Sequence, residues 1–405
     1  MKIKLPITIL LLVTSNFSDA QYAWYQKANV GGMNRQNAVG FAAGQYGYIG
    51  TGRNLETQTV LRDFWRYDPA NDTWTQVADF GGTARYAASC FVINDTAYVG
   101  CGNENIAVYH FVKDFWKYNQ GTNTWIKVAD FGGNARYAAP AFAIDTKGYV
   151  GTGYDQVTPR YQDFWEYNSI TDTWVQEADF PGGSREHGVG FAIDNYGYMG
   201  TGWDNSSSSD FYKYDPSNNA WTQIADLPTA ATSATCFVLN NEGYVGTGSV
   251  TYPAVNFFSH FWYYTPATNT WTAIADCSPT PRFNAVAFSI GSAGYCGTGG
   301  FLDFFNHDTV DFWKYAPSAV GITDITKEEC DINIFPNPVN EKLNVTVNNK
   351  ELSEIILYNV TSGKILQQQF SNSVSLNTAQ LLKGIYLYEV RNKNGVIKKG
   401  KVVKD

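Results

Sequence analysis

The sequence predicts an all-β protein in two parts, and three observations support this. Aromatic residues make up 16% of the 405 residues, charged residues only 16%, and there are 37 Gly. This composition favours short strands and tight turns over helical bundles. A motif of about 50 residues recurs along most of the chain. After Pro317 the repeat ends and the composition changes.

The repeat is anchored by a Trp, an Arg and a Tyr at constant positions. The Trp recurs at spacings of 50, 51, 49, 47 and 50 residues, as Trp24, Trp74, Trp125, Trp174, Trp221 and Trp271. Eleven residues later stands an Arg in five of the units, and Thr232 in the remaining one. The Tyr opens a Y-x-G-x-G motif, which is followed by F-[WY]-x-Y. Each unit therefore contains four short apolar runs.

Six such units predict a six-bladed β-propeller, in which each blade is a four-stranded meander. The first run of each unit is rich in Ala, Gly, Ser and Cys, which suits strands that crowd around a central axis. The Trp and Tyr rings are expected to fill the space between blades. We expect the second-strand glycines to leave room for those rings.

The repeats are out of phase with the ends of the chain. The sixth unit ends after Tyr315 with Ile322 where its Trp would stand, while residues 23–28 form an unpaired fourth strand around Trp24. We expect this N-terminal strand to complete the sixth blade, because closure leaves no exposed edge.

The pattern resembles the kelch repeat over residues 21–320. The matching features are the Arg that opens the first strand, the Y-x-G-x-G motif, the aromatic-x-Tyr motif and the outer-strand Trp. Gly-Thr-Gly replaces the family's Gly-Gly doublet, which we interpret as a subfamily trait. The resemblance implies a six-bladed kelch-type propeller.

Residues 1–20 read as a signal peptide. Lys2 and Lys4 precede an apolar run over residues 5–13, and Ser18 and Ala20 supply small residues before a cleavage site. No other run approaches the ~20 apolar residues of a membrane helix. We expect a mature chain that is exported and has no transmembrane segment.

The C-terminal part begins after a predicted linker over residues 321–331. Alternation at Leu343, Val345 and Val347 indicates half-buried strands, so residues 332–405 are expected to form a small Ig-like β-sandwich. Its F-P-N-P, L-Y-N-x-x-G-K and L-x-x-G-I-Y-x-x-x-V motifs and Lys-rich end resemble the type A C-terminal sorting domain of type IX secretion. An Ig-like carbohydrate-binding module is the alternative.

The sorting-domain resemblance implies a partner and a location. Type IX secretion machinery would engage residues 332–405, and the protein would be secreted or displayed on the outer-membrane surface of a Gram-negative bacterium. Residues 1–320 carry 18 Lys and Arg against 28 Asp and Glu. This acidic body argues against nucleic acid as a partner, because phosphate contacts need a basic face.

A ligand site is expected in the loops between second and third strands. These loops vary most in length and composition, and variable loops on a rigid scaffold are where binding residues concentrate. Exposed aromatics beside polar groups suit sugars or peptides. The alternative is that the rings only cover the propeller face. The candidates are Arg53, Tyr109, His110, Tyr154, Asp155, Trp203, Asp204, Phe304 and His307.

The arginines of the repeat form a second candidate site. Placed around the axis, they would recognise carboxylates or acidic sugars through bidentate hydrogen bonds. These residues are Arg35, Arg85, Arg136, Arg185 and Arg282. The alternative, which we favour, is a structural role in which they pair with the Asp of the Ala-Asp step, namely Asp79, Asp130, Asp179, Asp226 and Asp276.

Signals for catalysis are few, and no catalytic residue, metal ligand or cofactor is predicted. The chain lacks H-x-x-x-H, G-x-S-x-G and C-x-x-C motifs. Glu186 and His187 are the best acid–base candidates. Six Cys are too few for a disulfide scaffold. Cys90 and Cys101 would face each other if their hairpin turned at Asp95-Thr96; the alternative is that both are small buried side chains.

The leading hypothesis is a secreted or surface-displayed kelch propeller that binds a glycan or protein ligand. Because some kelch propellers are sialic-acid mutarotases or copper oxidases, an enzyme of either kind is the alternative. A purely architectural role in a surface layer is a third option.

Overall fold

The computed structural model describes residues 22–156, 159–250, 256–301, 307–317, 332–347, 352–359, 363–392 and 395–405, with the side chains of 395–397 excepted. The predicted signal peptide and linker lie outside these residues. The chain divides into two compact parts, Met1–Pro317 and Ser318–Asp405. Every regular element in the described residues is a strand, and they contain no helix that could cross a membrane.

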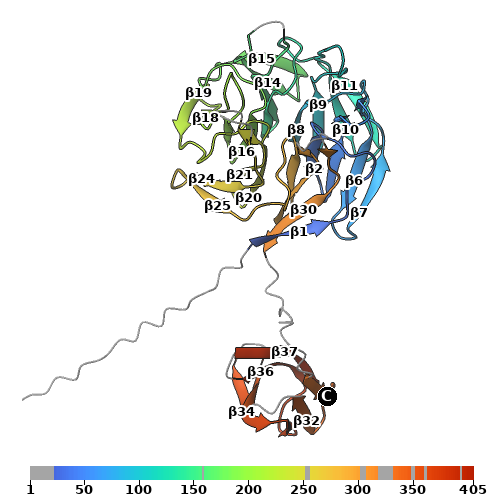
Figure 1. Ribbon diagram of the computed structural model, residues 1–405, viewed down its shortest axis with the longest axis vertical. Coiled ribbons are helices and arrows are strands. Elements are labelled where there is room, and N and C mark those ends of the chain that lie inside the picture. The colour runs from blue at the N-terminus through green and yellow to red at the C-terminus, as the bar shows by residue number, and fades with distance from the viewer. Residues whose placement is uncertain are drawn as a thin grey trace, which may run out of the picture. The chain divides into compact units, whose positions relative to one another are not determined.

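The described residues before Pro317 form six antiparallel sheets of four strands each, here called units 1 to 6 (Figure 1). Unit 1 comprises β2 (Val39–Ala43), β3 (Tyr46–Gly50), β6 (Phe64–Asp68) and β7 (Thr73–Val77). Unit 2 comprises β8 (Ser89–Ile93), β9 (Thr96–Gly100), β10 (Phe115–Asn119) and β11 (Thr124–Val128). Unit 3 comprises β12 (Ala141–Ile144), β13 (Lys147–Gly151), β14 (Phe164–Asn168) and β15 (Thr173–Glu177).

The remaining three sheets repeat this plan. Unit 4 comprises β16 (Val189–Ile193), β17 (Tyr196–Gly200), β18 (Phe211–Asp215) and β19 (Ala220–Ile224). Unit 5 comprises β20 (Thr235–Leu239), β21 (Glu242–Gly246), β24 (Phe261–Thr265) and β25 (Thr270–Ile274). Unit 6 comprises β26 (Val286–Ile290), β27 (Ala293–Gly297), β30 (Phe312–Pro317) and β1 (Tyr22–Lys27).

Short hairpins decorate three of the loops between second and third strands. These are β4 (Arg53–Asn54) with β5 (Thr59–Val60), β22 (Ser249–Val250) with β23 (Asn256–Phe257), and β28 (Gly300–Phe301) with β29 (His307–Asp308). The predicted variable loops therefore contain local structure that differs from unit to unit.

The N-terminal strand β1 pairs with β30, as the phase of the repeats predicted. Trp24 lies opposite Tyr315, and Gln26 lies opposite Trp313. The Trp24 indole donates a hydrogen bond to the Ala275 carbonyl of unit 5 at 2.9 Å. Trp74 makes the same bond to Ala28, the residue that follows β1, at 3.0 Å. Unit 6 thus joins its neighbours through the same contacts as the other units.

The six first strands contact one another in a closed cycle, from β2 through β8, β12, β16 and β20 to β26 and back to β2. Immediately before each first strand, one residue in the left-handed region donates its N–H to the carbonyl of its counterpart in the preceding unit, at 2.8–3.1 Å. Six such bonds complete a circle. The residues, here called the axial ring, are Asn37, Ala87, Ala138, His187, Ser233 and Asn284.

The hydrophobic core lies between adjacent sheets and is largely aromatic. Phe115 of unit 2, for example, packs on Trp174 of unit 3 with ring centroids 5.1 Å apart. The second-strand glycines leave space for rings, as expected, although the rings are Phe rather than Trp or Tyr. Gly151 faces Phe164 of its own unit, and Gly148 faces Phe91 of the preceding unit. A Cβ on Gly148 would lie 2.1 Å from a Phe91 ring carbon.

The C-terminal part, Ser318–Asp405, contains two antiparallel sheets in its described residues. One has the order β31 (Ile332–Phe335), β32 (Lys342–Val347), β35 (Ser373–Asn377), and the other β34 (Lys364–Ser371), β33 (Leu352–Tyr358), β36 (Gly384–Asn392), β37 (Gly395–Lys404). Side chains from both sheets share one core, including Val345 and Val390, both fully buried. Leu343 and Val347 are also buried, so the alternation predicted there is confirmed.

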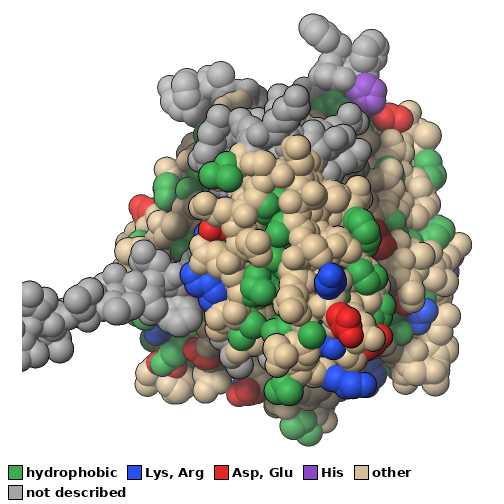
Figure 2. Space-filling model, turned by 90° about the horizontal axis from the view of Figure 1, so that it is seen from below, with side chains coloured by type: hydrophobic (Ala, Val, Ile, Leu, Met, Phe, Trp, Pro, Cys, Tyr) green, Lys and Arg blue, Asp and Glu red, His purple; other side chains and the backbone are tan. Residues whose placement is uncertain are grey.

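Charge is mixed on the surface. On the face drawn in Figure 2, Lys and Arg lie interspersed with Asp and Glu among uncharged side chains. Such a face offers phosphate groups no concentrated basic area.

Candidate functional site

A channel runs between the first strands of the six units. Its volume is about 240 Å³, and its lining includes small side chains such as Ala88, Ala139 and Gly188. The small residues expected around the axis therefore lie there. Polar groups reach the channel from the axial ring, where His187 and Asn284 contribute side chains.

Two sets of six residues surround the channel mouth on the side of the loops between second and third strands. The inner mouth positions follow the Arg position of each unit and precede the axial ring: Gln36, Tyr86, Tyr137, Glu186, Thr232 and Phe283. Each forms an isolated antiparallel bridge with an outer mouth position, in order Arg53, Asn103, Tyr154, Trp203, Ser249 and Gly300. Identical backbone geometry thus presents a different pair of side chains in every unit.

Units 2 to 4 present an aromatic cluster at this mouth, with Tyr137 at its centre. Its ring centroid lies 5.3 Å from Phe111, 6.4 Å from Tyr154 and 5.6 Å from the His187 ring. Tyr109 stacks on Phe111 at 6.0 Å and is 49% exposed. The cluster therefore extends from solvent to the axial ring.

Arg160 ties the outer part of this cluster together. Its guanidinium lies 3.9 Å from the Trp203 ring centroid and 4.7 Å from that of Tyr154. The same group bonds Glu186 Oε1 at 3.1 Å and approaches Asp204 Oδ1 at 3.4 Å. One face of the Trp203 ring is therefore already covered by the Arg160 guanidinium and is not available for stacking on a ligand.

Glu186 is the buried carboxylate of the mouth, with only 5% of its surface exposed. Its Oε2 is buried and receives no hydrogen bond from the residues that the structure describes, and His187 Nδ1 lies 3.4 Å away. Burial raises the pKa of Glu186, but His187, Tyr137 and Arg160 outweigh it and hold that pKa below its usual range. Burial and the Glu186 carboxylate raise the pKa of Tyr137. Glu186 is thus a charged hydrogen-bond acceptor with spare capacity.

The structure brings some of the predicted binding residues together and separates others. Tyr154, Trp203 and Asp204 gather around Arg160, while Asp155 lies beside them and accepts a hydrogen bond from Tyr161 at 2.6 Å. Arg53, in unit 1, lies over the Tyr86 ring at 4.5 Å.

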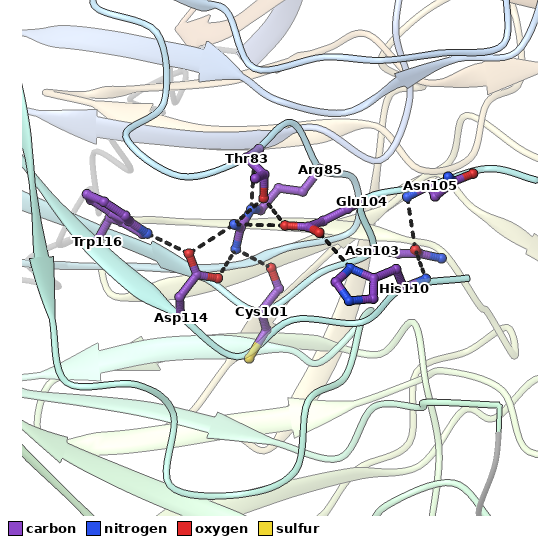
Figure 3. A network of polar contacts seen from close by, with 9 residues as sticks. All are labelled: Thr83, Arg85, Cys101, Asn103, Glu104, Asn105, His110, Asp114 and Trp116. Atoms are coloured by element: carbon purple, nitrogen blue, oxygen red, sulfur yellow. Dashed lines mark hydrogen bonds and ion pairs between the residues drawn. The ribbon is translucent and has the colours of Figure 1, made fainter. Parts of the chain in front are cut away.

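Three other predicted residues lie apart from the Arg160 cluster or cannot be located. His110 bonds Glu104 at 2.6 Å (Figure 3). His307 stacks on Phe301 in unit 6, with centroids 5.5 Å apart. Phe304 lies outside the described residues. From the sequence, Glu186 was a candidate only for catalysis, Arg160 was one polar residue of a variable loop with no role of its own, and Tyr137 was no candidate. The signal that was available is that an ionised residue replaces the Tyr of units 2 and 3 at one repeat position.

The five arginines considered as a ligand-binding ring are buried and paired with aspartates in the structure. All five side chains are 5% exposed or less, and each makes a two-pronged bond to the Asp that precedes its third strand. Figure 3 shows Arg85 with Asp114 at 2.7 and 3.1 Å and with the Cys101 carbonyl at 3.1 Å. The pairs are Arg35–Asp63, Arg85–Asp114, Arg136–Asp163, Arg185–Asp210 and Arg282–Asp311.

The structural role that the sequence favoured is therefore present, but with a different Asp. The aspartates of the Ala-Asp step lie elsewhere: Asp130, for example, pairs with Lys127 at 3.0 Å. In unit 5 the sequence indicates which Asp is the partner of the Arg. Ala231 accepts there the backbone bond that the Arg accepts in other units, so Ala231, rather than Thr232, occupies the Arg position. His260 replaces the Asp. Both partners are absent from the same unit.

The described residues contain no group of three or more His, Cys, Asp and Glu side chains arranged to hold a metal. Cys90 and Cys101 are free thiols, and the register of their hairpin does not place them opposite each other as the cross-strand bridge requires. The hairpin pairs Ile93 with Thr96 and turns one residue earlier than assumed, which places Cys90 opposite Val99.

Comparisons with known proteins agree with this architecture. A KLHDC2/KLHL20/DRC7 Kelch-repeats domain model matches residues 81–248 and a Kelch motif model residues 46–81. A model of the secretion system C-terminal sorting domain matches residues 333–404. A solved structure titled "Structure of YjhT" aligns with a TM-score of 0.59 at 13% identity, over 71% of this chain and 96% of the other. No curated protein matches significantly.

The all-β fold, the repeats and the structural neighbour define the N-terminal part as a kelch-type β-propeller. Residues 46–248 contain kelch repeats, and residues 333–404 contain a type IX sorting domain. The sorting domain indicates secretion or a cell-surface location and implies interaction with the type IX machinery.

Proposed function

We propose that this protein is an exported six-bladed kelch propeller that binds glycans at the channel mouth of units 2 to 4. In this proposal the six sheets are the blades, β1 closes the ring, residues 1–20 are a signal peptide, and residues 332–405 are an Ig-like sorting domain. The circle of axial hydrogen bonds supports six blades.

The buried Glu186 carboxylate is the observation that carries the binding proposal. Its buried Oε2 receives no hydrogen bond from the described residues, and His187 Nδ1 lies 3.4 Å from it. A buried charged acceptor is stabilised by a hydrogen bond that it gains from a ligand. A sugar hydroxyl supplies such a donor. The neighbouring Tyr137 ring offers an apolar face for the C–H side of a sugar, a common arrangement in ligand sites with a few fixed polar groups. Peptide N–H groups would also donate, but they do not need the aromatic floor.

A glycan array with the purified propeller tests this proposal. We expect binding of a defined glycan set, and at least ~10-fold weaker binding by Glu186→Gln, which keeps the shape of the side chain but removes its charge. Glu56→Gln is the matched control, because Glu56 is exposed and lies in unit 1. Equal binding by Glu186→Gln, or capture of a protein partner with no glycan bound, would contradict the proposal.

A mutarotase-like enzyme is the second candidate, favoured by one observation. Glu186, His187 and Tyr137 are three proton-exchanging groups within contact of one another at the mouth. Such a group can move protons to and from a bound sugar. Accelerated anomer exchange of a bound reducing sugar, followed by NMR and lost in Glu186→Gln, would favour the enzyme. Binding without exchange would favour the binding module.

A further inference from the structure

Two cysteines meet in the core between units 5 and 6. Cys277 follows β25 of unit 5, and Cys296 lies in β27 of unit 6. Both are fully buried, and their Sγ atoms lie 3.9 Å apart. The structure records both as free thiols, and a disulfide would need the two sulfurs to approach to about 2 Å. The two sulfurs therefore have to approach each other by about 2 Å for the bond to form.

The internal repeats show that this pair is unusual. Cys277 occupies the position after the Ala-Asp step, and Cys296 the position after the Tyr of Y-x-G-x-G. At the other five junctions between units, the same two positions share a core cluster and hold only apolar residues. Those pairs are Val30–Ile49, Phe80–Val99, Phe131–Val150, Phe180–Met199 and Leu227–Val245.

We propose that Cys277 and Cys296 form a disulfide in the exported protein and so link unit 5 to unit 6. One apolar position changed to Cys is an ordinary packing substitution, but here both members of one contacting pair are Cys. Disulfides form and persist in the oxidising compartments that an exported chain enters. The sorting domain indicates secretion or surface location for this chain.

The reaction is thiol–disulfide exchange with a disulfide-bearing oxidant, either a protein oxidoreductase or a small-molecule disulfide. One cysteine thiolate attacks the oxidant and displaces a thiol, and the second thiolate then attacks the mixed disulfide and displaces the other. The two cysteines lose two electrons and two protons, and the oxidant becomes two thiols. A hydrogen bond from Cys296 and the nearby Arg282 lower the pKa of Cys277 despite its burial.

The position of the bond gives it a purpose. Unit 6 is the sheet that β1 completes from the other end of the chain, so its fourth strand is held by pairing and packing alone. Cys296 lies in β27, which pairs directly with β30, the partner of β1. A covalent link at this junction therefore holds unit 6 against unit 5 during and after ring closure.

The test uses the full chain isolated from an oxidising compartment without reductant. After denaturation and alkylation, peptide mass spectrometry should find the Cys277 and Cys296 peptides joined and about 2 Da lighter than the two thiol peptides together. Cys90 and Cys236 should be alkylated in the same sample and serve as internal references. Reductant should lower the melting temperature of the protein by about 5 °C.

The Cys277→Leu/Cys296→Val double variant is the matched control, because it recreates the Leu227–Val245 pair of the preceding junction. It should fold, and its melting temperature should not respond to reductant. Alkylation of both Cys277 and Cys296 in the unreduced wild-type protein would overturn the proposal. An equal response to reductant in the double variant would overturn it as well.

Discussion

Arg185 and Glu186 are neighbours in the chain, yet they belong to two contrasting regions of the propeller. Arg185 is one of five arginines that repeat the same buried pairing with an Asp. Glu186 is an inner mouth position, and the corresponding residues in the other units are Gln, Tyr, Tyr, Thr and Phe. The residue type at the Arg185 position is constrained by its pairing with Asp210. The residue type at the Glu186 position varies between units, because only its backbone takes part in the repeated bridge.

The difference shows how to interpret a repeat protein. A residue type that recurs in most units, as arginine does in five of six, is explained here by packing and pairing even though its chemistry suits ligand binding. A departure from the repeat is informative only when its partner is also considered. Ala231 and His260 both differ from the repeat because they stand where the other units have a paired Arg and Asp. Cys277 and Cys296 also differ together, because they contact each other at positions that are apolar at the other junctions. The Glu186 carboxylate departs from the repeat, and its Oε2 receives no hydrogen bond from the described residues although His187 Nδ1 lies 3.4 Å away.

Deleting β1 is expected to have the largest effect on stability, because β1 completes the sheet of unit 6 and packs its Trp24 against unit 5. Trp24 packs on Phe261 and Tyr315 with ring centroids 5.2 and 5.1 Å away, and β30 would become an exposed edge without β1. Removing residues 22–27 should abolish cooperative unfolding in calorimetry. Removing only residues 1–20 is the control. An unchanged transition after the longer deletion would show that the six sheets do not depend on closure.

A smaller but still large effect is expected from Arg136→Ala. Arg136 bonds Asp163 at 2.5 and 2.9 Å and the Thr152 carbonyl at 2.8 Å. Its loss leaves the part-buried Asp163 carboxylate without its cation, although the Trp165 indole still donates to it. We expect a loss of about 3–5 kcal/mol in the free energy of unfolding, measured with denaturant. Arg62→Ala, which breaks an exposed pair with Asp79, should cost less than about 1 kcal/mol. Similar losses in the two variants would remove the distinction between the regions.

The smallest effect is a dependence of stability on acid. Burial raises the pKa values of Asp114 and Asp311, but Arg85 and Arg282 outweigh it, so both pKa values lie below 3.8. Each carboxylate therefore contributes stability that is fully present above its unfolded-state pKa, near 4, and is lost as pH falls through the lower folded-state pKa. The urea midpoint should be constant from about pH 7 to 5 and should decline below about pH 4.

The Asp114→Asn variant separates this acid effect from general charge repulsion. It should be less stable than the wild type at neutral pH and should lose less stability on acidification, because one of the two groups no longer titrates. A decline as steep as that of the wild type would indicate that the acid effect arises outside the buried pairs.

The sequence determined the elements that repeat. The spacing of Trp24, Trp74 and their successors locates the four-stranded sheets, and the phase of the repeats places the N-terminal strand beside the sixth. Both follow from local periodicity, which is present in the chain before folding. The sorting domain was likewise carried by contiguous motifs. The hairpin of Cys90 was misplaced by one residue because turn geometry, not hydrophobic pattern, sets its register.

Only the tertiary structure decided which side chains meet. Arg35 pairs with Asp63 across 28 positions, and Cys277 meets Cys296 from a different unit. Arg160 reaches Glu186 and Trp203 from the loop of the preceding unit. Such contacts depend on how neighbouring sheets are rotated and spaced around the axis, which sets distances of a few ångströms between residues that no local pattern relates. The sequence therefore determined the ring, and the packing of its sheets determined the chemistry at its mouth and in its core.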